Sequence, residues 1–262
     1  MPPWPAVDRP PLPDPESYDR WCLRYPAAFF RQIERYAALG PGSRVLEVYS
    51  LTGRHTLPLL QMGCRVEAVE PRAAFARYLR NRLVRYRDCT VHELPPNQLR
   101  LPDGSLDLIL SADAAHCLPL LPQLFPLLRD GGTLALLGSH TTVFWGEVRL
   151  GACRQAHRHP GFLDWLPAAY GNLALPLFFE WAGRYQLEAP AIDSHRQQRT
   201  CSPVEYIHLL RIQPGHLRLP PLTRMKLEAN LLRELPAGGP IRLCDTLELC
   251  LARKPAAPPA NP

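Results

Sequence analysis

A short apolar strand runs directly into a turn and then a helix near the start of the chain. The segment reads Arg44-Val-Leu-Glu-Val-Tyr-Ser-Leu-Thr-Gly-Arg-His-Thr56. A parallel strand that ends in a tight turn and feeds a helix leaves backbone N–H groups facing a crevice that a ligand can approach. Such a loop usually carries a G-x-G-x-G spacing, because glycine adopts a positive φ at no steric cost and has no side chain in the ligand's way. Only Gly53 is present here, so the segment predicts a nucleotide-cofactor fold with an altered loop.

Two acidic residues lie close to this loop. Glu47 stands inside the apolar strand, where a carboxylate is costly unless it is paired or binds a ligand. It is therefore either a ligand contact or a structural hydrogen-bonding group. Glu70 ends a second short apolar strand, residues 65–70, about 20 residues after the loop, which is the spacing of an acid that binds a ribose diol at a neighbouring strand tip. An exposed acid at a strand end is the alternative interpretation of Glu70.

The loop, the second strand and two later segments together resemble the class I S-adenosylmethionine-dependent methyltransferases. The similarity is to the broad small-molecule group, whose first motif reads roughly V-L-[ED]-x-G-x-G-T-G-R-x-T. The matching segments are Val45-Leu-Glu-Val48, Thr52-Gly-Arg-His-Thr56, Val69-Glu-Pro71, Leu101-Pro-Asp-Gly-Ser-Leu-Asp-Leu-Ile-Leu110 and Leu128-Arg-Asp-Gly-Gly-Thr-Leu-Ala-Leu136. The resemblance extends over roughly residues 15–254.

The resemblance implies an enzyme that transfers a methyl group from S-adenosylmethionine to a small molecule. The cofactor-binding positions that it implies are Glu47, Tyr49, Gly53, Glu70, Ser111 and Asp113. His116 follows the predicted fourth strand, where the family often keeps a polar or aromatic residue facing the transferred methyl group. A histidine there suits a general base on a substrate hydroxyl or amine, because its pKa lies near neutrality. Pocket-lining and purely structural roles are the alternatives for His116.

The loop departs from the family motif at two positions. Tyr49 and Leu51 stand where the family has glycine, and the remaining Gly53 is equally explained by close packing of a helix on a strand. If position 49 or 51 needs a positive φ, a non-glycine residue costs on the order of 1–3 kcal/mol, or about tenfold to a hundredfold in affinity. This predicts a weakened cofactor site. The alternatives are a catalytically inactive or repurposed methyltransferase fold that does not bind the cofactor, and an RNA methyltransferase or other nucleotide-binding activity.

Apolar segments of strand and helix type alternate along the chain. Strands are expected at residues 44–49, 65–70, 89–93, 106–111, 132–138, 190–199 and 241–253. Helices are expected at residues 16–39, 53–62, 72–84, 119–129, 203–213 and 221–235. This alternation predicts an α/β class fold, a Rossmann-like doubly wound sheet of about seven strands that is mostly parallel and has right-handed crossovers. The resemblance adds an antiparallel last strand. Pro126 should kink or shorten its helix.

Five segments are expected along the chain. They are an N-terminal arm and helix at 1–40, a Rossmann-like cofactor-binding core at 41–140, a helical cap or substrate insert at 141–189, C-terminal strands and helices that complete the sheet at 190–254, and a disordered tail at 255–262. The cap is predicted where the alternation lapses and aromatic residues such as Trp145, Trp165 and Trp181 gather. An extra packing layer without a pocket is the alternative to a cap. Clustered prolines predict the disordered tail.

Composition limits where such a chain acts and what it binds. The 262 residues are 46% hydrophobic and 21% charged, which is ordinary for a globular chain with a large core. A membrane span needs about 18 consecutive apolar residues, and no apolar run in the sequence is that long. The start of the sequence also lacks the basic and apolar regions of a secretory signal. These features predict a cytoplasmic protein without a membrane partner.

Charge and cysteine usage argue against a nucleic-acid or metal partner. The net charge of +6 includes several arginines between residues 72 and 87, which fall on several faces of the predicted helix and so favour a solvated surface over a nucleic-acid contact. The eight cysteines form no C-x-x-C pair, which favours buried, reduced thiols. His157 and His159 have no third ligand at a suitable spacing, so no metal site is predicted.

Overall fold

The computed structural model describes residues 11–144, 169–172, 174–234 and 240–256. Contacts between residues divide the chain into two units. The Rossmann-like unit comprises the described parts of 24–138, 172–195 and 247–262. The helical unit comprises the described parts of 1–23, 139–171 and 196–246.

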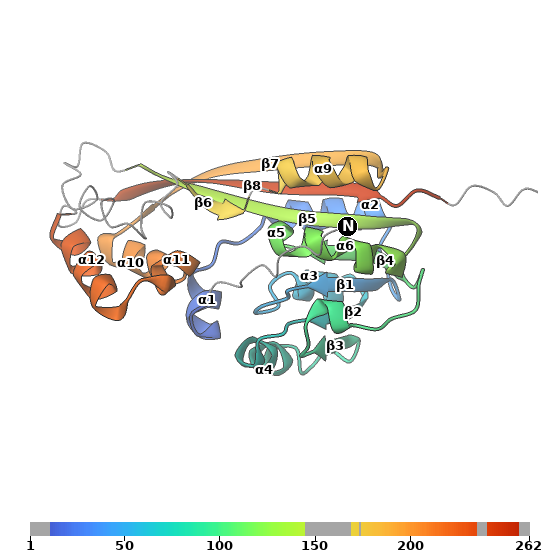
Figure 1. The fold of residues 1–262 in the computed structure, drawn as a ribbon, viewed down its shortest axis with the longest axis horizontal. Coiled ribbons are helices and arrows are strands. Elements are labelled where there is room, and N and C mark those ends of the chain that lie inside the picture. Colours follow the sequence, from blue (N-terminus) through green and yellow to red (C-terminus); the bar gives the residue numbers. More distant parts are fainter. Residues whose placement is uncertain (1–10, 145–168, 173, 235–239, 257–262) are drawn as a thin grey trace, which may run out of the picture. The chain divides into compact units, whose positions relative to one another are not determined.

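Strands and helices alternate through the Rossmann-like unit, as the sequence predicts (Figure 1). Its elements up to the fourth strand are α2 (Ala27–Ala37), β1 (Arg44–Val48), α3 (Thr56–Gln61), β2 (Arg65–Val69), α4 (Ala73–Arg82), β3 (Cys89–His92), the 3-10 turn η1 (Pro96–Gln98) and β4 (Leu106–Ser111). Short turns of helix follow in α5 (Ala114–Cys117), η2 (Leu118–Leu120), α6 (Leu121–Leu124) and η3 (Phe125–Leu127), and α9 (Leu175–Arg184) comes later.

The helical unit contains α1 (Pro15–Trp21), α10 (Pro203–Arg211), α11 (Pro214–Arg218) and α12 (Pro221–Glu234). Strands β5 (Leu128–Phe144), β6 (Ala169–Asn172), β7 (Glu188–Cys201) and β8 (Ile241–Arg253) have residues in both units.

The strands form one sheet with the order β3-β2-β1-β4-β5-β8-β7, and β6 pairs with β5. Each neighbouring pair from β3 to β5 is parallel. In the register of the central strands, Val48 at the end of β1 lies opposite Val69 of β2 and Ser111 of β4. The carboxyl ends of these three strands therefore meet at one edge of the sheet, which is where ligands bind in folds of this kind.

The last strand runs against the others. The backbone N–H of Gly131, near the start of β5, donates to the carbonyl of Lys254, which directly follows β8, at 3.1 Å. The N–H of Lys254 donates back to Gly132 at 2.8 Å. The start of β5 thus pairs with the end of β8, so the two strands are antiparallel. This confirms the predicted fold class, a mostly parallel Rossmann-like sheet with an antiparallel last strand.

Continuous apolar runs build the central strands. Val45, Leu46 and Val48 of β1 are fully buried, and so are Leu108 and Ile109 of β4. Parallel strands covered on both faces lack the alternation of polar and apolar residues seen in half-exposed strands. This burial explains why the sequence predicts these strands within a residue or two of their observed ends.

The segment between β4 and β5 is not the single helix that the sequence predicts at 119–129. It consists of α5, η2, α6 and η3, each only three or four residues long. Pro119, Pro122 and Pro126 each stand in the first two positions of one of the last three turns. Proline fits a first turn but cannot continue a helix that has already begun, because it lacks an N–H and its ring meets the preceding turn. The expected shortening at Pro126 is confirmed, and the same effect recurs at the other two prolines.

The helical unit has its own hydrophobic core. Its buried members include Tyr206 and Leu210 of α10, Leu227 and Leu231 of α12, and Leu243 of β8. At the start of α10 the hydroxyl of Ser202 accepts the N–H of Glu205, while the Glu205 carboxylate accepts the N–H of Ser202. This reciprocal capping pair satisfies two backbone donors that a helix start leaves open.

Most of the predicted helical cap cannot be compared with the structure. Residues 145–168, with Trp145 and Trp165, lie outside the described part of the chain, as do the terminal residues 1–10 and 257–262. In the described part of the cap segment, α9 carries Trp181, which is buried in the main core of the Rossmann-like unit. The cap and the disordered tail therefore stay predictions.

Candidate functional site

The loop after β1 has the backbone that its glycine motif predicts. Tyr49 has φ 65°, Leu51 has φ 50° and Gly53 has φ 78°. All three positions of the G-x-G-x-G spacing are therefore left-handed, although glycine occupies only the last. A non-glycine residue pays a cost of roughly 1–3 kcal/mol in such a conformation, and it persists only where the surroundings hold it in place.

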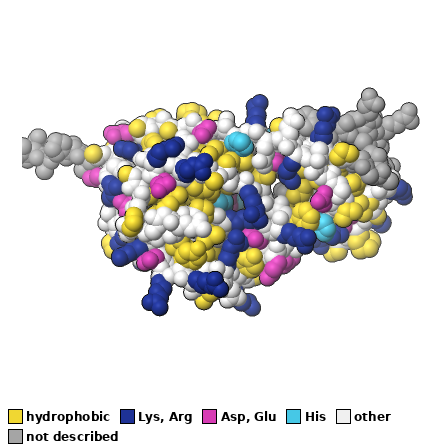
Figure 2. Space-filling view, turned by 180° about the vertical axis from the view of Figure 1, so that it is seen from behind, with side chains coloured by type: hydrophobic (Ala, Val, Ile, Leu, Met, Phe, Trp, Pro, Cys, Tyr) yellow, Lys and Arg dark blue, Asp and Glu magenta, His cyan; other side chains and the backbone are white. Residues whose placement is uncertain are grey.

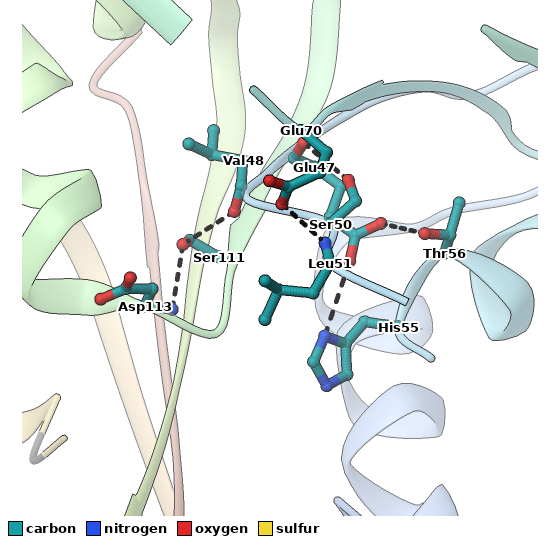
Figure 3. Close-up of polar contacts among 9 residues, drawn as sticks. All are labelled: Glu47, Val48, Ser50, Leu51, His55, Thr56, Glu70, Ser111 and Asp113. Atoms are coloured by element: carbon teal, nitrogen blue, oxygen red, sulfur yellow. Dashed lines mark hydrogen bonds and ion pairs between the residues drawn. The ribbon is translucent and has the colours of Figure 1, made fainter. Parts of the chain in front are cut away.

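Hydrogen bonds from the neighbouring strand hold this loop. The N–H groups of Tyr49 and Ser50 both donate to the carbonyl of Val69, at 2.9 and 3.1 Å. The N–H of Leu51 donates to Glu70 Oε2 at 3.1 Å (Figure 3). The sequence predicts N–H groups that face a ligand crevice, and for these three that expectation is corrected, because each already has an acceptor in the protein.

Glu70 directly follows β2 and is fully buried. Besides the N–H of Leu51, its carboxylate accepts the N–H of Arg72 at Oε1, at 2.9 Å, and the Arg72 guanidinium lies 3.7 Å from the same oxygen. Burial excludes the alternative of an exposed strand-end acid. A carboxylate offers about four lone-pair sites, so these two backbone donors do not by themselves exclude a hydroxyl group from a ligand.

Glu47 is almost completely buried at the end of β1, with 1% of its surface exposed. Its Oε2 accepts the hydroxyl hydrogen of Thr56, and His55 Nδ1 lies 3.5 Å from Oε1 (Figure 3). Among the described residues Oε1 has no hydrogen-bond donor. A buried carboxylate oxygen without a hydrogen bond is costly, so Glu47 has a structural hydrogen bond at Oε2 and only an ion-pair contact with His55 at Oε1.

Gly53 is required for packing whatever the loop binds. A Cβ at this position would lie 2.4 Å from Leu79 Cδ1 of α4. The positive φ adds strain for any other residue. The structure therefore supports the helix-packing explanation of Gly53.

Ser111 ties β4 to β1. Its hydroxyl group donates to the carbonyl of Val48 at 3.1 Å, and the same oxygen accepts the N–H of Asp113 at 3.1 Å (Figure 3). Ser111 is fully buried. These contacts make Ser111 a positioning residue, which fixes where Asp113 leaves the strand.

Asp113 and His116 form a side-chain pair one helical turn apart. His116 Nδ1 lies 2.7 Å from Asp113 Oδ1, which also accepts the His116 backbone N–H at 3.4 Å as the cap of α5. An aspartate on Nδ1 selects the tautomer that carries its proton there, which leaves a lone pair on Nε2. Nε2 is buried and has no hydrogen-bond partner among the described residues. The pair has the geometry of a general base held by an acid.

The Tyr49 ring packs on the α5 side of the loop. It is 7% exposed and belongs to the same apolar cluster as Ala114, Cys117 and Leu118. Its ring meets that of His116 edge to face, with centroids 6.3 Å apart and planes at 87°. Tyr49 is thus a neighbour of the candidate base.

The sequence did not predict that Thr56 and His55 contact Glu47. Thr56 donates to Glu47 from the first turn of α3. His55 lies beside Glu47 and packs on Phe30 and Tyr25, with centroid separations of 6.2 and 5.3 Å. A polar residue in the turn that follows a buried acid is the sequence signal for such a contact.

The described residues contain no group of three or more His, Cys, Asp or Glu side chains that could hold a metal ion. His157 and His159 lie outside the described part of the chain. Of the helices in that part, none is long and apolar enough to cross a membrane.

Comparison with known proteins identifies a methyltransferase domain and similar folds. Residues 46–136 match the family model described as "Methyltransferase domain". A putative type II methyltransferase from Anaeromyxobacter dehalogenans superposes with a TM-score of 0.56 and 20% identity, over 89% of this chain and 98% of that one. The YcgJ protein from Bacillus subtilis gives a TM-score of 0.58 and 15% identity, over 88% and 99% of the two chains.

A third similar structure comes from a larger protein. It is phosphoethanolamine N-methyltransferase 2 from Haemonchus contortus, in complex with phosphomonomethylethanolamine and S-adenosylhomocysteine. The TM-score is 0.54 at 12% identity, over 92% of this chain and 57% of that one. No curated protein matches the sequence.

The family match and the sheet order together confirm the resemblance seen in the sequence motifs. Residues 46–136 carry a methyltransferase domain, and they lie within a sheet of Rossmann-like order.

Proposed function

We propose that this protein transfers the methyl group of S-adenosylmethionine to a small molecule. One observation carries the proposal. The buried carboxylates of Glu47 and Glu70 lie at the ends of the adjacent parallel strands β1 and β2, on either side of a left-handed loop, and one oxygen of Glu47 has no donor among the described residues. Buried acids are retained at such a place when a ligand or a structural partner satisfies them.

The residues present fit the cofactor. Glu47 Oε1 suits the ammonium of the methionine end, because it is a buried carboxylate oxygen that accepts no hydrogen bond from the described residues and has only an ion-pair contact with His55. Glu70 suits the ribose hydroxyl groups, which donate to a carboxylate as backbone N–H groups do. The bound cofactor supplies an activated methyl group on sulfur. The protein's contribution is to hold the reacting groups in position and keep water out.

His116 is the candidate catalytic residue. Asp113 holds the proton of His116 on Nδ1, so the Nε2 lone pair can accept a proton from a substrate hydroxyl or amine. Asp113 is then a positioning residue, and Ser111 fixes it in turn through its N–H. Tyr49 lies edge to face against the base and restricts its movement.

The surface supports a small acceptor over a nucleic acid. Two arginines of the predicted cluster are already paired, Arg72 with Glu70 at 3.7 Å and Arg80 with Glu93 at 2.7 Å. On the face seen in Figure 2, Lys and Arg side chains are interspersed with acidic and apolar groups. A nucleic-acid contact needs a continuous basic patch. The Haemonchus contortus methyltransferase of similar fold, which holds phosphomonomethylethanolamine, adds support for a small acceptor.

The test is transfer of a labelled methyl group. The full chain is incubated with methyl-labelled S-adenosylmethionine and, separately, with a cell extract of small molecules, total RNA or denatured protein. We expect label in the small-molecule fraction, lost in His116→Gln and kept in His92→Gln, a matched change on β3. Label in RNA or protein alone would show that the methyl acceptor belongs to that class and is not a small molecule. No transfer to any fraction together with no cofactor binding would indicate a repurposed fold.

A further inference from the structure

The helical unit contains a cavity of about 460 Å³ that the methyl-transfer proposal does not use. It lies between α1 and the helices α10 to α12, and its walls include Trp21, His208, Arg211, Arg224 and Glu228. All of these residues belong to the helical unit. The volume lies within the range of small-molecule sites, about 300–1,000 Å³.

Two aromatic side chains, Trp21 and His208, belong to the lining of the cavity. The rings of Trp21 and His208 stack with centroids 4.7 Å apart and planes at 5°. Ile212, Leu217 and Met225 extend the lining with aliphatic groups, and Met225 is 65% exposed. An exposed methionine beside a tryptophan adapts easily to a flat apolar ligand, because both present apolar surface and methionine is flexible.

The acidic groups of the cavity already have donors. Glu228 accepts both Arg211 Nε at 3.1 Å and Arg211 Nη2 at 2.7 Å, and it also contacts His216 Nε2 at 2.9 Å. Asp14 accepts the N–H of Ser17 at 2.8 Å as the cap of α1. These carboxylates are therefore poor anchors for a cationic ligand.

Arg224 differs from the other charged groups of the cavity. Within the part of the chain that the structure describes, no carboxylate lies within ion-pair distance of its guanidinium, although it lines the cavity from α12. The neighbouring Arg211 is neutralised by Glu228. Arg224 thus supplies a planar, permanently charged fork that suits a bidentate carboxylate.

We propose that this cavity binds a small organic carboxylate with an aromatic or similarly flat apolar body. Its carboxylate pairs with Arg224, and its body lies against the stacked rings of Trp21 and His208. The proposal concerns the helical unit alone and does not depend on cofactor binding or methyl transfer.

The test uses phenylacetate and indole-3-acetate as probes, with phenylacetamide as the neutral counterpart. Each is titrated calorimetrically into the full chain. We expect the two carboxylates to bind with dissociation constants near or below about 1 mM and the amide to bind about tenfold to a hundredfold more weakly, because a charge-assisted hydrogen bond is lost. Indole-3-acetate, the larger ring system, should bind more tightly than phenylacetate.

Two matched variants locate the site. Arg224→Gln should weaken both carboxylates by about tenfold or more, whereas Lys226→Gln, which removes the same charge from an exposed position on the same helix, should not. Equal affinity for the acid and the amide, unchanged affinity in Arg224→Gln, or no binding of either acid at about 10 mM would each overturn the proposal. The comparison of acid with amide uses the unaltered protein, so it tests the need for a carboxylate even if Arg224→Gln folds poorly.

Discussion

The carboxylate of Glu70 accepts the backbone N–H of Leu51 at 3.1 Å, across 19 positions of sequence. This contact joins the acid at the tip of β2 to a loop residue held at φ 50°. The group expected to bind the ribose therefore also stabilises the strained loop conformation. The proposed ribose contact of Glu70 would couple cofactor binding to the geometry of this loop.

Leu51 provides a direct test of the loop strain. Both Leu51→Gly and Leu51→Ala remove the leucine side chain, but only glycine relieves the left-handed conformation. We expect the glycine variant to have the higher free energy of unfolding, by about 1 kcal/mol. At a position with a negative φ, the alanine variant would instead be the more stable of the two by roughly 0.5–1 kcal/mol. Urea unfolding of the two variants measures the difference, and an alanine variant as stable as the glycine variant would refute strain at this position.

A side chain at Gly53 should destabilise the fold. Gly53→Ala places a Cβ 2.4 Å from Leu79 Cδ1 and keeps a φ of 78°, so we expect a loss of about 1–3 kcal/mol in the free energy of unfolding. The control is Gly183→Ala in α9, where a Cβ would meet nothing within 4 Å. That change should be neutral or stabilise by up to about 1 kcal/mol. Equal effects of the two substitutions on thermal unfolding would contradict the packing argument.

The central strands and the backbone of the loop after β1 could be predicted from the local sequence. The apolar runs of β1, β2 and β4 are buried on both faces, so hydrophobicity alone locates them. The glycine spacing likewise predicts left-handed backbone at positions 49 and 51, and this is confirmed. These features depend on neighbouring residues only.

The rest of the site depends on contacts between distant segments. Nothing near Leu51 in the sequence shows that its N–H donates to Glu70, since the contact depends on how β1 and β2 pair. The pairing of Asp113 with His116 could have been predicted from the sequence, because the two residues are three positions apart. The cavity lined by Trp21 and Arg224 could not be predicted from the sequence, because residues about 200 positions apart form it.

His216 should make the helical unit sensitive to acid. Burial lowers the pKa of His216 below its usual value of 6.5, against the opposing hydrogen bond to Glu228. The unfolded chain then binds the proton more readily than the folded chain, so the contribution to stability is full above pH 6.5 and is lost as the pH falls toward the folded pKa. Hydrogen bonds from Arg211 and His216 outweigh burial and lower the pKa of Glu228, which acts in the same direction at lower pH.

Unfolding free energies measured between about pH 5 and 8 test this expectation. His216→Gln should flatten the decline below pH 6.5. The exposed His195→Gln serves as the control and should leave the decline unchanged. A wild-type profile that is flat over this range would contradict the assignment to His216.

The cysteines should differ sharply in reactivity. Burial raises the pKa of Cys117 and of Cys250 to about 12, and of Cys64 to about 11. The thiolate is the reactive form, so these three should resist alkylation at about pH 8 in the folded protein. Of the cysteines in the described ranges, the partly exposed Cys22 and Cys244 should react first. Mass mapping after a short iodoacetamide pulse gives the order, and early modification of Cys117 or Cys250 would show that the core opens.

Calorimetric titration with S-adenosylhomocysteine tests the central claim most directly. The native chain should bind with micromolar affinity, and Glu70→Gln should weaken binding by about tenfold or more through the lost charge. Glu67→Gln on β2, which pairs with His92 at 2.6 Å, removes the same charge from the same strand and should bind like the native chain. No heat of binding to the native chain at about 1 mM ligand would contradict a cofactor site at this edge of the sheet.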